Sequence, residues 1–468
     1  MANRKPGLIL EIADKFQSYH FHQISANRFN HKTLLNALIE FNSNSKLEIA
    51  TLGYSEEGRE IKNIVYGKGN TNVLLWSQMH GNESTATRAI LDILNFLIAD
   101  DEFNSFRELI AKNLTLQFIP MLNPDGAERF QRRNAMEIDI NRDAVALQSQ
   151  EAKLLHEQVE KFKPHFAFNL HDQRRFYNVT GTGVPSSMSF LAPAYDHTRK
   201  VNIVRKKAMQ VIAGLNETLQ EYIPGGVGLY DDAYSHRSFG DYLQSKGVST
   251  ILVESGWQQN DMEKEGVRKL NFISLLKAFE LLGTKTFDNV STESYTSIPT
   301  IDTKLFDVLI KSVKVAGSKT SRIDIGINRT EHLIRHPDYY SVGRIDDLGD
   351  LSSFFGFLAI DEPGLSVAPG KMAHLNAYED LSLITVKRLL RQGILFLVTE
   401  KVPLEPYTTY PINIVHPRKL PYLKHPVFEG IANFLLLDQA NSIKYIILNG
   451  FVFQPGEIND NANGLVIS

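Results

Sequence analysis

The chain has 468 residues, a length typical of roughly two to four domains, and its 43% of apolar and 22% of charged residues are ordinary for a globular protein. The net charge of −3 excludes a bulk attraction to nucleic acid or to an anionic membrane, so we expect neither partner. Without cysteine there are no disulfides, and any metal must be bound by His, Asp or Glu. We find no apolar run of about eighteen residues and no signal-peptide core, which favours a cytoplasmic protein.

The first 284 residues alternate between short apolar runs and segments with helical spacing. The predicted elements are, in chain order, helix 27–41, strands 46–52, 60–67 and 72–78, helices 84–97 and 103–112, strand 114–120, helix 148–162, strand 166–170, helices 201–219 and 238–245, strand 248–253 and helix 262–282. This alternation predicts an α/β fold with a mainly parallel mixed sheet flanked by helices. In such a fold the functional residues lie at the carboxyl ends of strands.

A polar segment rich in Thr and Ser, residues 285–300, predicts a domain boundary. Beyond it the pattern changes to short β-like runs such as 357–360, 393–398 and 445–448, with one modest helix at 377–390. We therefore expect two domains. Residues 1–284 form the α/β domain, and residues 301–468 form a smaller, mostly-β, sandwich-like accessory domain of unknown role.

The stretch from Ser77 to Ser84 is a candidate metal-binding turn, because it follows the strand 72–78 and contains His80 and Glu83 three residues apart. Alone, this pair is also typical of a surface histidine beside a helix-capping carboxylate. A catalytic zinc usually takes three protein ligands and leaves one position for water, so a third ligand is needed. His171 and Glu254 end two further predicted strands, so both belong to the same edge of the sheet as His80.

Seven ordered pieces of the sequence, spread over about residues 45–282, resemble the M14 zinc metallocarboxypeptidase family, which is carboxypeptidase A-like. The pieces are Gly53-x-Ser55-x-x-Gly58-Arg59, His80-x-x-Glu83, Asn123-Pro-Asp-Gly126, Arg132-x-Asn134-Ala135, Asp139-x-Asn141-Arg142, His171 and Val253-Glu254-Ser255. The resemblance implies a zinc-carboxypeptidase-like sheet and one Zn²⁺ per chain.

The resemblance also implies a role for each matching residue near the metal. His80, Glu83 and His171 correspond to the zinc ligands, and Asp139 to the carboxylate that orients the first histidine. Glu254 corresponds to the catalytic glutamate, which takes a proton from the attacking water and delivers it to the leaving amine.

Further matches concern the substrate. Arg132 corresponds to the arginine that stabilises the oxyanion, although Arg133 is adjacent and the assignment could shift by one. Asn141 and Arg142 correspond to the pair that binds the terminal carboxylate of the substrate. Tyr234 is our choice for the mobile tyrosine that precedes the glutamate, with Tyr230 as its competitor.

The function that follows is a zinc-dependent hydrolase of peptide or amide bonds, of the metallocarboxypeptidase type, acting on an amide next to a free carboxylate. Asp143 and Asp172 depart from the usual pattern, and Glu83 lies only 88 positions before His171, which leaves the substrate open. The alternative is an N-acyl amino acid amidohydrolase or deacylase on the same scaffold, similar to aspartoacylase and succinylglutamate desuccinylase. A binding module without activity is a third hypothesis, which intact Glu254 and Arg132 disfavour.

His20-Phe21-His22 resembles the metal turn of amidohydrolase barrels, and the tail from Gly430 to Gly450 resembles the β-sandwich end of such enzymes. Eight βα units cannot be found between them, however. We therefore interpret His20 and His22 as two partly exposed histidines of a connecting segment.

Overall fold

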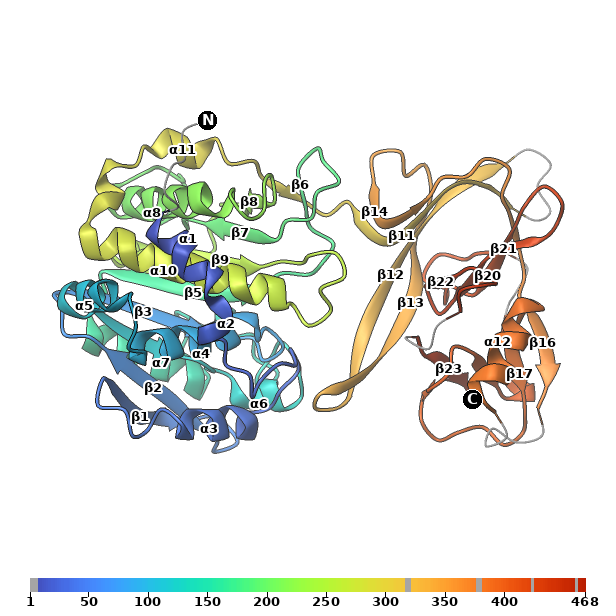
Figure 1. Cartoon of the computed structure of the whole chain (residues 1–468), viewed down its shortest axis with the longest axis horizontal. Coiled ribbons are helices and arrows are strands. Elements are labelled where there is room, and N and C mark those ends of the chain that lie inside the picture. The colour runs from blue at the N-terminus through green and yellow to red at the C-terminus, as the bar shows by residue number, and fades with distance from the viewer. Residues whose placement is uncertain (1–6, 316–320, 376–380, 422–424, 459–461) are drawn as a thin grey trace. The chain divides into compact units, whose positions relative to one another are not determined.

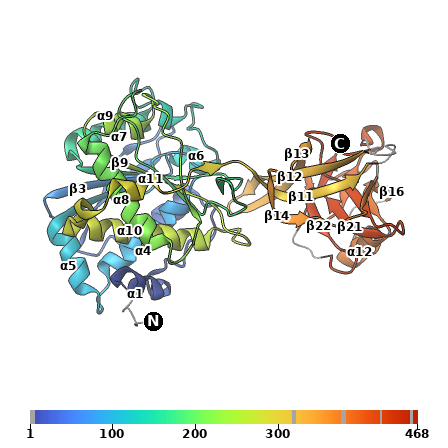
Figure 2. The ribbon, with the colours of Figure 1, turned by 90° about the horizontal axis from the view of Figure 1, so that it is seen from above.

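The computed structural model describes residues 7–315, 321–375, 381–421, 425–458 and 462–468. The chain forms two compact units, Met1–Thr303 and Lys304–Ser468, which Figures 1 and 2 draw in blue to yellow and in orange to red. The division falls just after the polar segment 285–300, where the sequence predicts a boundary.

An eight-stranded sheet forms the centre of the N-terminal unit, in the order β1-β2-β4-β3-β5-β9-β7-β8. The four central strands β4, β3, β5 and β9 are parallel to one another, whereas β1, β2 and β7 introduce antiparallel pairs. The strands are β1 (Leu47–Tyr54), β2 (Glu60–Tyr66), β3 (Thr71–Ser77), β4 (Leu114–Ile119), β5 (Phe166–Asp172), β7 (Met188–Leu191), β8 (Val227–Leu229) and β9 (Ser249–Ser255). The predicted mainly parallel mixed sheet is confirmed, and β7 and β8 are strands that periodicity did not reveal.

Helices cover both faces of this sheet (Figure 1). The main helices are α3 (His31–Ile39), α4 (Thr85–Ile98), α5 (Asn104–Asn113), α7 (Gln150–Phe162), α8 (Ile203–Leu219), α9 (Phe239–Ser245) and α10 (Glu265–Thr284). Along β3, Val73 and Leu75 pack with α4, α5, α8 and α10, whereas Leu74 and Trp76 pack with α7 and α9. This alternation follows from the two-residue period of a strand, so a strand buried on both faces is apolar throughout.

Polar caps place the first residues of several helices. The side chain of Asn30 accepts a hydrogen bond from the Thr33 amide, so the helix predicted for 27–41 begins only at His31. Ser149 and Asn202 cap α7 and α8 in the same way. Two short helices that the sequence analysis did not predict, α1 (Leu8–Asp14) and α2 (Phe16–Tyr19), precede α3 and pack into the same core.

The remaining short elements of the N-terminal unit connect or extend this framework. They are β6 (Asn178–Val179), paired with β10 (Ile301–Asp302), the helices α6 (Pro124–Glu128) and α11 (Thr292–Thr296), and the 3-10 turns η1 (Ile140–Arg142) and η2 (Thr286–Asn289).

The C-terminal unit contains two sheets that share a core. The larger sheet has the order β13-β12-β11-β15-β20-β21-β22, with β14 paired to β11, and the smaller sheet has the order β16-β17-β19-β23-β18. The larger sheet consists of β11 (Leu305–Lys314), β12 (Arg322–Arg335), β13 (Asp338–Gly349), β14 (Phe355–Ile360), β15 (Ser366–Ala368), β20 (Phe434–Leu437), β21 (Ile443–Leu448) and β22 (Phe451–Phe453). The smaller sheet consists of β16 (Lys371–His374), β17 (Ile394–Val398), β18 (Tyr407–Thr408), β19 (Asn413–Val415) and β23 (Gly464–Ile467).

One helix and one 3-10 turn interrupt these strands, α12 (Leu383–Arg391) and η4 (Pro417–Lys419). The helix predicted for 377–390 corresponds to α12, and its first residues, 377–380, lie outside the described residues. In the smaller sheet β16, β17, β19 and β23 are parallel, so the unit is β-rich without being purely antiparallel.

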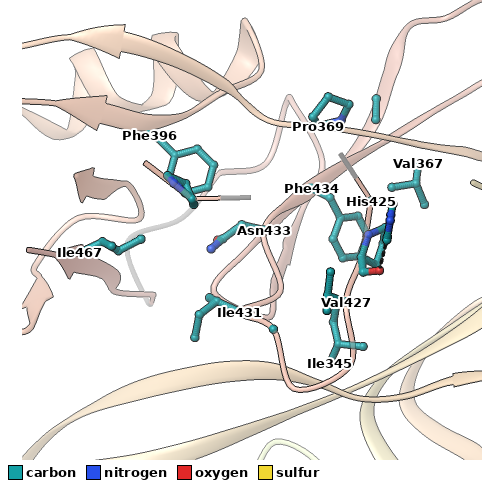
Figure 3. Close-up of a pocket in the computed structure, with 14 residues that line it drawn as sticks. Ile345, Val367, Pro369, Phe396, His425, Val427, Ile431, Asn433, Phe434 and Ile467 are labelled. Atoms are coloured by element: carbon teal, nitrogen blue, oxygen red, sulfur yellow. Dashed lines mark hydrogen bonds between the residues drawn. The ribbon is translucent and has the colours of Figure 1, made fainter. Parts of the chain in front are cut away.

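An apolar cavity of about 600 Å³ lies within the C-terminal unit (Figure 3). Phe396, Phe434 and Ile467 contribute to its lining, and His425 and Asn433 are among its few polar residues. Within the described part of the chain, no helix combines the length and the hydropathy that crossing a membrane requires.

Candidate metal centre

The centre lies where the connections of the N-terminal sheet change direction. From β3 the chain passes to β4 on one side, and from β4 it returns to β5 on the other side of β3. Such a switch leaves a crevice at the carboxyl ends of the strands. His80 follows β3, and His171 lies near the end of β5, so both histidines reach this crevice.

His80 and Glu83 lie on a tight turn between β3 and α4, before the first turn of the helix, and the Glu83 amide donates to the His80 carbonyl at 3.1 Å. Gly81 at the turn passes close to the backbone of α6. A Cβ at this position would lie 2.0 Å from the carbonyl carbon of Gly126, so only glycine fits. The turn is therefore held in shape by backbone contact.

His80, Glu83 and His171 bring their ligating atoms within 4.8 Å of one another, and all three residues are buried. The Nδ1 atom of His80 lies 2.8 Å from Oε1 of Glu83, and Nδ1 of His171 lies 2.7 Å from Oε2. The two Nδ1 atoms lie 3.1 Å apart. Two imidazoles and one carboxylate whose ligating atoms face a common point are a donor set that zinc prefers.

The surroundings of His80 Nδ1 also fit a cation. This one nitrogen lies within 3.1 Å of Glu83, of His171 and of Nη1 of Arg132. A ring nitrogen carries either one proton or one lone pair, so it cannot satisfy three such neighbours as a hydrogen-bonding group. A metal ion at the shared point would bind the histidine and glutamate atoms together.

Asp139 orients two of these groups. Its Oδ1 lies 3.1 Å from Nε2 of His80, the nitrogen that faces away from Glu83, and its Oδ2 accepts from Nε of Arg132 at 3.0 Å. Burial disfavours the charge of Asp139, yet His80 and Arg132 lower its pKa well below the usual range. An ionised carboxylate behind a histidine fixes the ring and its tautomer for metal binding.

Burial shifts the pKa values of the other two triad residues, Glu83 and His171, in opposite directions. Burial raises the pKa of Glu83, but His80 and His171 outweigh this effect and lower it below the usual value. Burial lowers the pKa of His171, which favours the neutral imidazole that a metal requires.

Glu254 is the register partner of His171 in the adjacent strand β9, so the sheet itself places this carboxylate beside the triad. Burial, followed by the charges of Glu83 and Asp172, raises the pKa of Glu254 well above the usual value. Four carboxylates, Glu83, Asp139, Asp172 and Glu254, gather here with the two cations Arg132 and Lys264.

Asn141 and Arg142 lie on η1, next to the start of α9. Nδ2 of Asn141 lies 3.4 Å from Nε2 of His171, and its Oδ1 accepts from the Phe239 amide at 3.0 Å. Arg142 donates through Nη1 to the Asn141 carbonyl and to Oγ of Ser238, at 2.8 and 3.0 Å. These bonds hold the exposed guanidinium near the metal triad.

The two candidate tyrosines occupy different surroundings. Tyr230 lies close enough to Glu254 for its charge, after burial, to raise the pKa of the phenol, and its hydroxyl lies 2.9 Å from that of Tyr177. Tyr234 instead packs edge-on against His197 with ring centroids 4.7 Å apart. Tyr230 is therefore within the electrostatic influence of Glu254, whereas Tyr234 contacts His197.

Several motif residues support the site without facing it. Asp125 accepts hydrogen bonds from Ser55 Oγ at 2.7 Å and from Arg59 Nη1 at 2.6 Å, which ties the turn between β1 and β2 to α6. Asn134 accepts from two amides of the loop that carries Arg132 and Asp139. Asp143, the departure noted in the sequence, binds the amide and hydroxyl of Ser149 ahead of α7.

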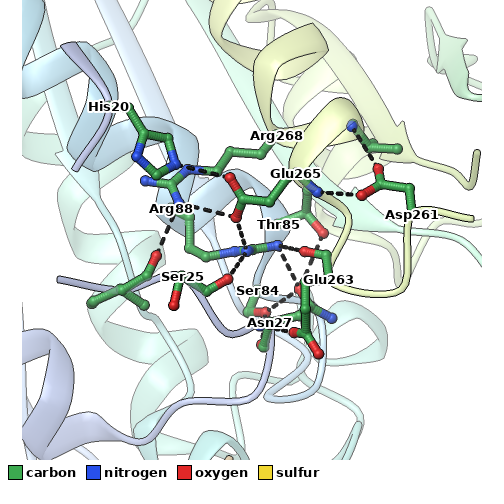
Figure 4. Close-up of polar contacts among 12 residues, drawn as sticks. His20, Ser25, Asn27, Ser84, Thr85, Arg88, Asp261, Glu263, Glu265 and Arg268 are labelled. Carbon is green, nitrogen blue, oxygen red and sulfur yellow. Dashed lines mark hydrogen bonds and ion pairs between the residues drawn. The ribbon is translucent and has the colours of Figure 1, made fainter. Parts of the chain in front are cut away.

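The pair His20 and His22 belongs to a different region. Their Nδ1 atoms lie 3.0 Å apart, and Nε2 of His20 lies 2.8 Å from Oε2 of Glu265 (Figure 4). Among the described residues, the group suited to a metal ion is His80, Glu83 and His171. Both histidines lie in the segment that connects α2 to α3, as predicted, but only His22 is exposed, whereas His20 is buried by its packing and its contact with Glu265.

Comparison with known proteins agrees with this geometry. Residues 35–179 match the family model for zinc carboxypeptidases, Peptidase M14. In this segment, about a third of the chain, the sequence is similar to the M14 zinc carboxypeptidase family. The matched residues include the whole metal triad, whereas Glu254 lies beyond them. The zinc predicted from the sequence is the cofactor of this family, and the N-terminal unit, called the M14 unit below, contains the His-Glu-His group for it.

Named relatives of the M14 unit include fungal carboxypeptidases. Probable carboxypeptidase 2 of Arthroderma benhamiae is 32% identical over 128 residues, covering 25% of this chain and 24% of the relative. Carboxypeptidase 2 of Trichophyton rubrum is 31% identical over 141 residues, covering 28% and 26%. The match thus spans about a quarter of the length of these relatives.

Among solved structures, a metallo-carboxypeptidase from Burkholderia cenocepacia superposes with a TM-score of 0.46 and 15% identity, over 56% of this chain and 71% of that one. A carboxypeptidase A from Helicoverpa armigera gives a TM-score of 0.43 and 13% identity, over 60% and 80%.

Two residues beside the centre were not predicted from the sequence. Lys264 approaches Asp172, and Tyr177 contacts Tyr230. No local pattern marks either one, because each lies in a loop whose path depends on distant elements.

Proposed function

We propose that the M14 unit is a zinc-dependent carboxypeptidase that hydrolyses the peptide bond next to the free carboxylate of its substrate. The observation that carries this proposal is the convergence of His80, Glu83 and His171, with Glu254 in register beside His171. A metal triad and a carboxylate that is not part of it are the two components that this hydrolysis needs.

Arg142 and Asn141 bind the terminal carboxylate in this proposal. A guanidinium presents parallel N–H groups that match a carboxylate, and Nη1 of Arg142 is already held by Ser238. Because Asn141 also contacts His171, a carboxylate bound here places its neighbouring amide next to the metal triad. Nη1 of Arg132 lies 3.1 Å from Nδ1 of His80, so its fixed positive charge is available to stabilise the developing oxyanion.

Glu254 acts as the general base and then as the general acid. Its carboxylate accepts a proton from the attacking water and returns it to the nitrogen of the leaving amine, so the proton count balances over the reaction. When bound by His80, Glu83 and His171, zinc polarises the carbonyl and lowers the pKa of water. Tyr230, beside Glu254, is our revised choice for the tyrosine that contacts the substrate.

The test combines metal analysis with a substrate panel. We expect about one zinc per chain, lost in His80→Ala, and release of the C-terminal residue from peptides by the purified protein. A matched set of N-acyl amino acids distinguishes the deacylase alternative, because a deacylase hydrolyses these and leaves longer peptides intact. Zinc that is absent, or unchanged by His80→Ala, would contradict the proposed site.

A further inference from the structure

Lys264 is a buried lysine that approaches the metal centre from the loop before α10. Its ammonium donates to Oδ2 of Asp172 at 3.1 Å, and the two side chains are only 9% and 6% exposed. The same ammonium lies 3.4 Å from the carbonyl of Ser255, the residue after Glu254. Asp172 ends strand β5, and Lys264 lies 92 positions later in the chain. Burying such an ion pair carries a large desolvation cost, so the pair is weak evidence for a role in stability alone.

Asp172 connects this lysine to the metal turn by two routes. Its backbone N–H donates to Oε2 of Glu83 at 3.2 Å, and its Oδ2 accepts from Oγ1 of Thr85 at 2.5 Å. Thr85 is the first residue of α4, two positions after Glu83. Asp172 therefore contacts both the ligand Glu83 and the helix start that follows it.

The backbone around Lys264 is held independently of the metal. Lys264 has a left-handed conformation, with φ 52° and ψ 34°, at the start of α10. Asp261 accepts from the amides of Glu265 and Gly266 at 2.7 and 2.9 Å, and Nη2 of Arg88 donates to the Glu263 carbonyl at 2.6 Å (Figure 4). A non-glycine residue in this conformation persists where its surroundings enforce it.

We propose that Lys264 is a positioning residue that holds Asp172, and through it Glu83 and Thr85, in the arrangement that binds zinc. It contacts no ligating atom and acts through Asp172. The proposal rests on the proposed function only in taking His80, Glu83 and His171 as the zinc ligands.

The charge of Lys264 and its positioning role affect zinc affinity in opposite directions, which makes the proposal testable. Removing a cation from a group of four carboxylates would by itself strengthen the binding of Zn²⁺, because the site becomes more negative. Losing the position of Asp172 would weaken it, and loss of a residue that orients a metal ligand typically costs about 10 to 100-fold in affinity. The direction of the change therefore separates the two roles.

The experiment measures the zinc dissociation constant of the full chain by competition with a chromophoric chelator. We expect Lys264→Met to weaken zinc binding by about 10 to 100-fold. Lys264→Arg keeps the charge and the hydrogen-bond donor, so we expect it to retain most of the wild-type zinc affinity. The matched control is Lys277→Met on the same helix, whose half-buried partner is Glu280, and we expect no change there.

A double-variant cycle tests the route through Asp172. If Lys264 acts through this carboxylate, Lys264→Met combined with Asp172→Asn weakens zinc binding no more than Asp172→Asn alone. Losses that multiply would overturn the proposal, as would unchanged or tighter zinc binding in Lys264→Met. Should that variant fail to fold, Thr85→Val removes the hydroxyl bond to Asp172, together with a long contact to Asn27 at 3.5 Å, and weaker zinc binding is then expected for the same reason. Unchanged zinc affinity in Thr85→Val would overturn the proposal.

Failure of the proposed function is distinguishable from failure of this inference. A wild-type chain that binds zinc but cleaves neither peptides nor acyl amino acids contradicts the proposed activity and leaves the zinc measurements valid. A wild-type chain that cleaves peptides, with a Lys264→Met variant of unchanged zinc affinity, contradicts this inference alone.

Discussion

Replacing Glu254 by Gln separates the chemistry of the M14 unit from its metal binding. The substitution keeps the size and shape of the side chain but removes its ability to accept a proton. His80, Glu83 and His171 make no hydrogen bond to Glu254 among the described contacts, so we expect zinc content to remain at the wild-type level. Turnover should fall while substrate binding through Arg142 is retained.

The expected size of the loss follows from the role of the group. General acid and base catalysis typically contributes about 10² to 10⁴-fold, which corresponds to about 3 to 5 kcal/mol of transition-state stabilisation. Because Glu254 serves both proton transfers in the proposed mechanism, we expect kcat to fall toward the upper end of this range with KM nearly unchanged. The assay is hydrolysis of a chromogenic C-terminal dipeptide, with zinc measured on the same samples.

The stability of the metal-free protein provides an independent check. Burial raises the pKa of Glu254 well above its usual value, so the folded chain disfavours the charged form more than the unfolded chain does. The ionised carboxylate therefore destabilises the metal-free fold at neutral pH, and this effect disappears below the ordinary carboxyl pKa. We expect metal-free Glu254→Gln to melt at or above the wild-type temperature at pH 7, with no difference at low pH.

Two results would refute this reasoning. Full turnover in Glu254→Gln would exclude the proposed proton transfers, and loss of zinc in the variant would mean that Glu254 is a ligand. Glu280→Gln, on a half-buried glutamate of α10 that pairs with Lys277, is the control and should leave both quantities unchanged.

Three further changes give distinct expectations. Asp139→Asn should weaken zinc binding by about 10 to 100-fold in chelator competition, because the His80 ring loses its ionised partner, and unchanged affinity would contradict that role. Tyr230→Phe should reduce kcat/KM for peptides whereas Tyr234→Phe should not, and the reverse order would restore Tyr234 as the substrate-binding residue. Asp92→Ala should destabilise the fold by about 3 to 5 kcal/mol in urea unfolding, because the fully buried Arg268 guanidinium loses both bonds to Asp92, at 2.6 and 2.7 Å, and keeps only the longer ion pair to Glu265 at 3.2 Å. A loss below about 1 kcal/mol would contradict this view.

The central strands of the M14 unit and the positions of its main site residues could be predicted from the sequence. Central strands that are buried on both faces must be apolar throughout, and the carboxyl ends of parallel strands meet at one edge. His80, His171 and Glu254 follow or end such runs, so their proximity follows from local pattern and fold class alone. The motif around Asp139 and Arg132 lies within one short loop, and its match also follows from sequence.

Other parts of the site depend on contacts between distant segments. Asp172 and Lys264 are separated by 92 positions, and they meet because the loop before α10 is held by Arg88 and by the cap at Asp261. Likewise, the position of Tyr230 depends on β8, which it directly follows, and on the pairing of β8 with β7, and these short strands have no periodicity strong enough to predict. Sequence by itself determines which residues lie at the ends of strands. The tertiary structure alone decides which loop residues reach them, because a loop follows a path set by the packing of the elements on either side.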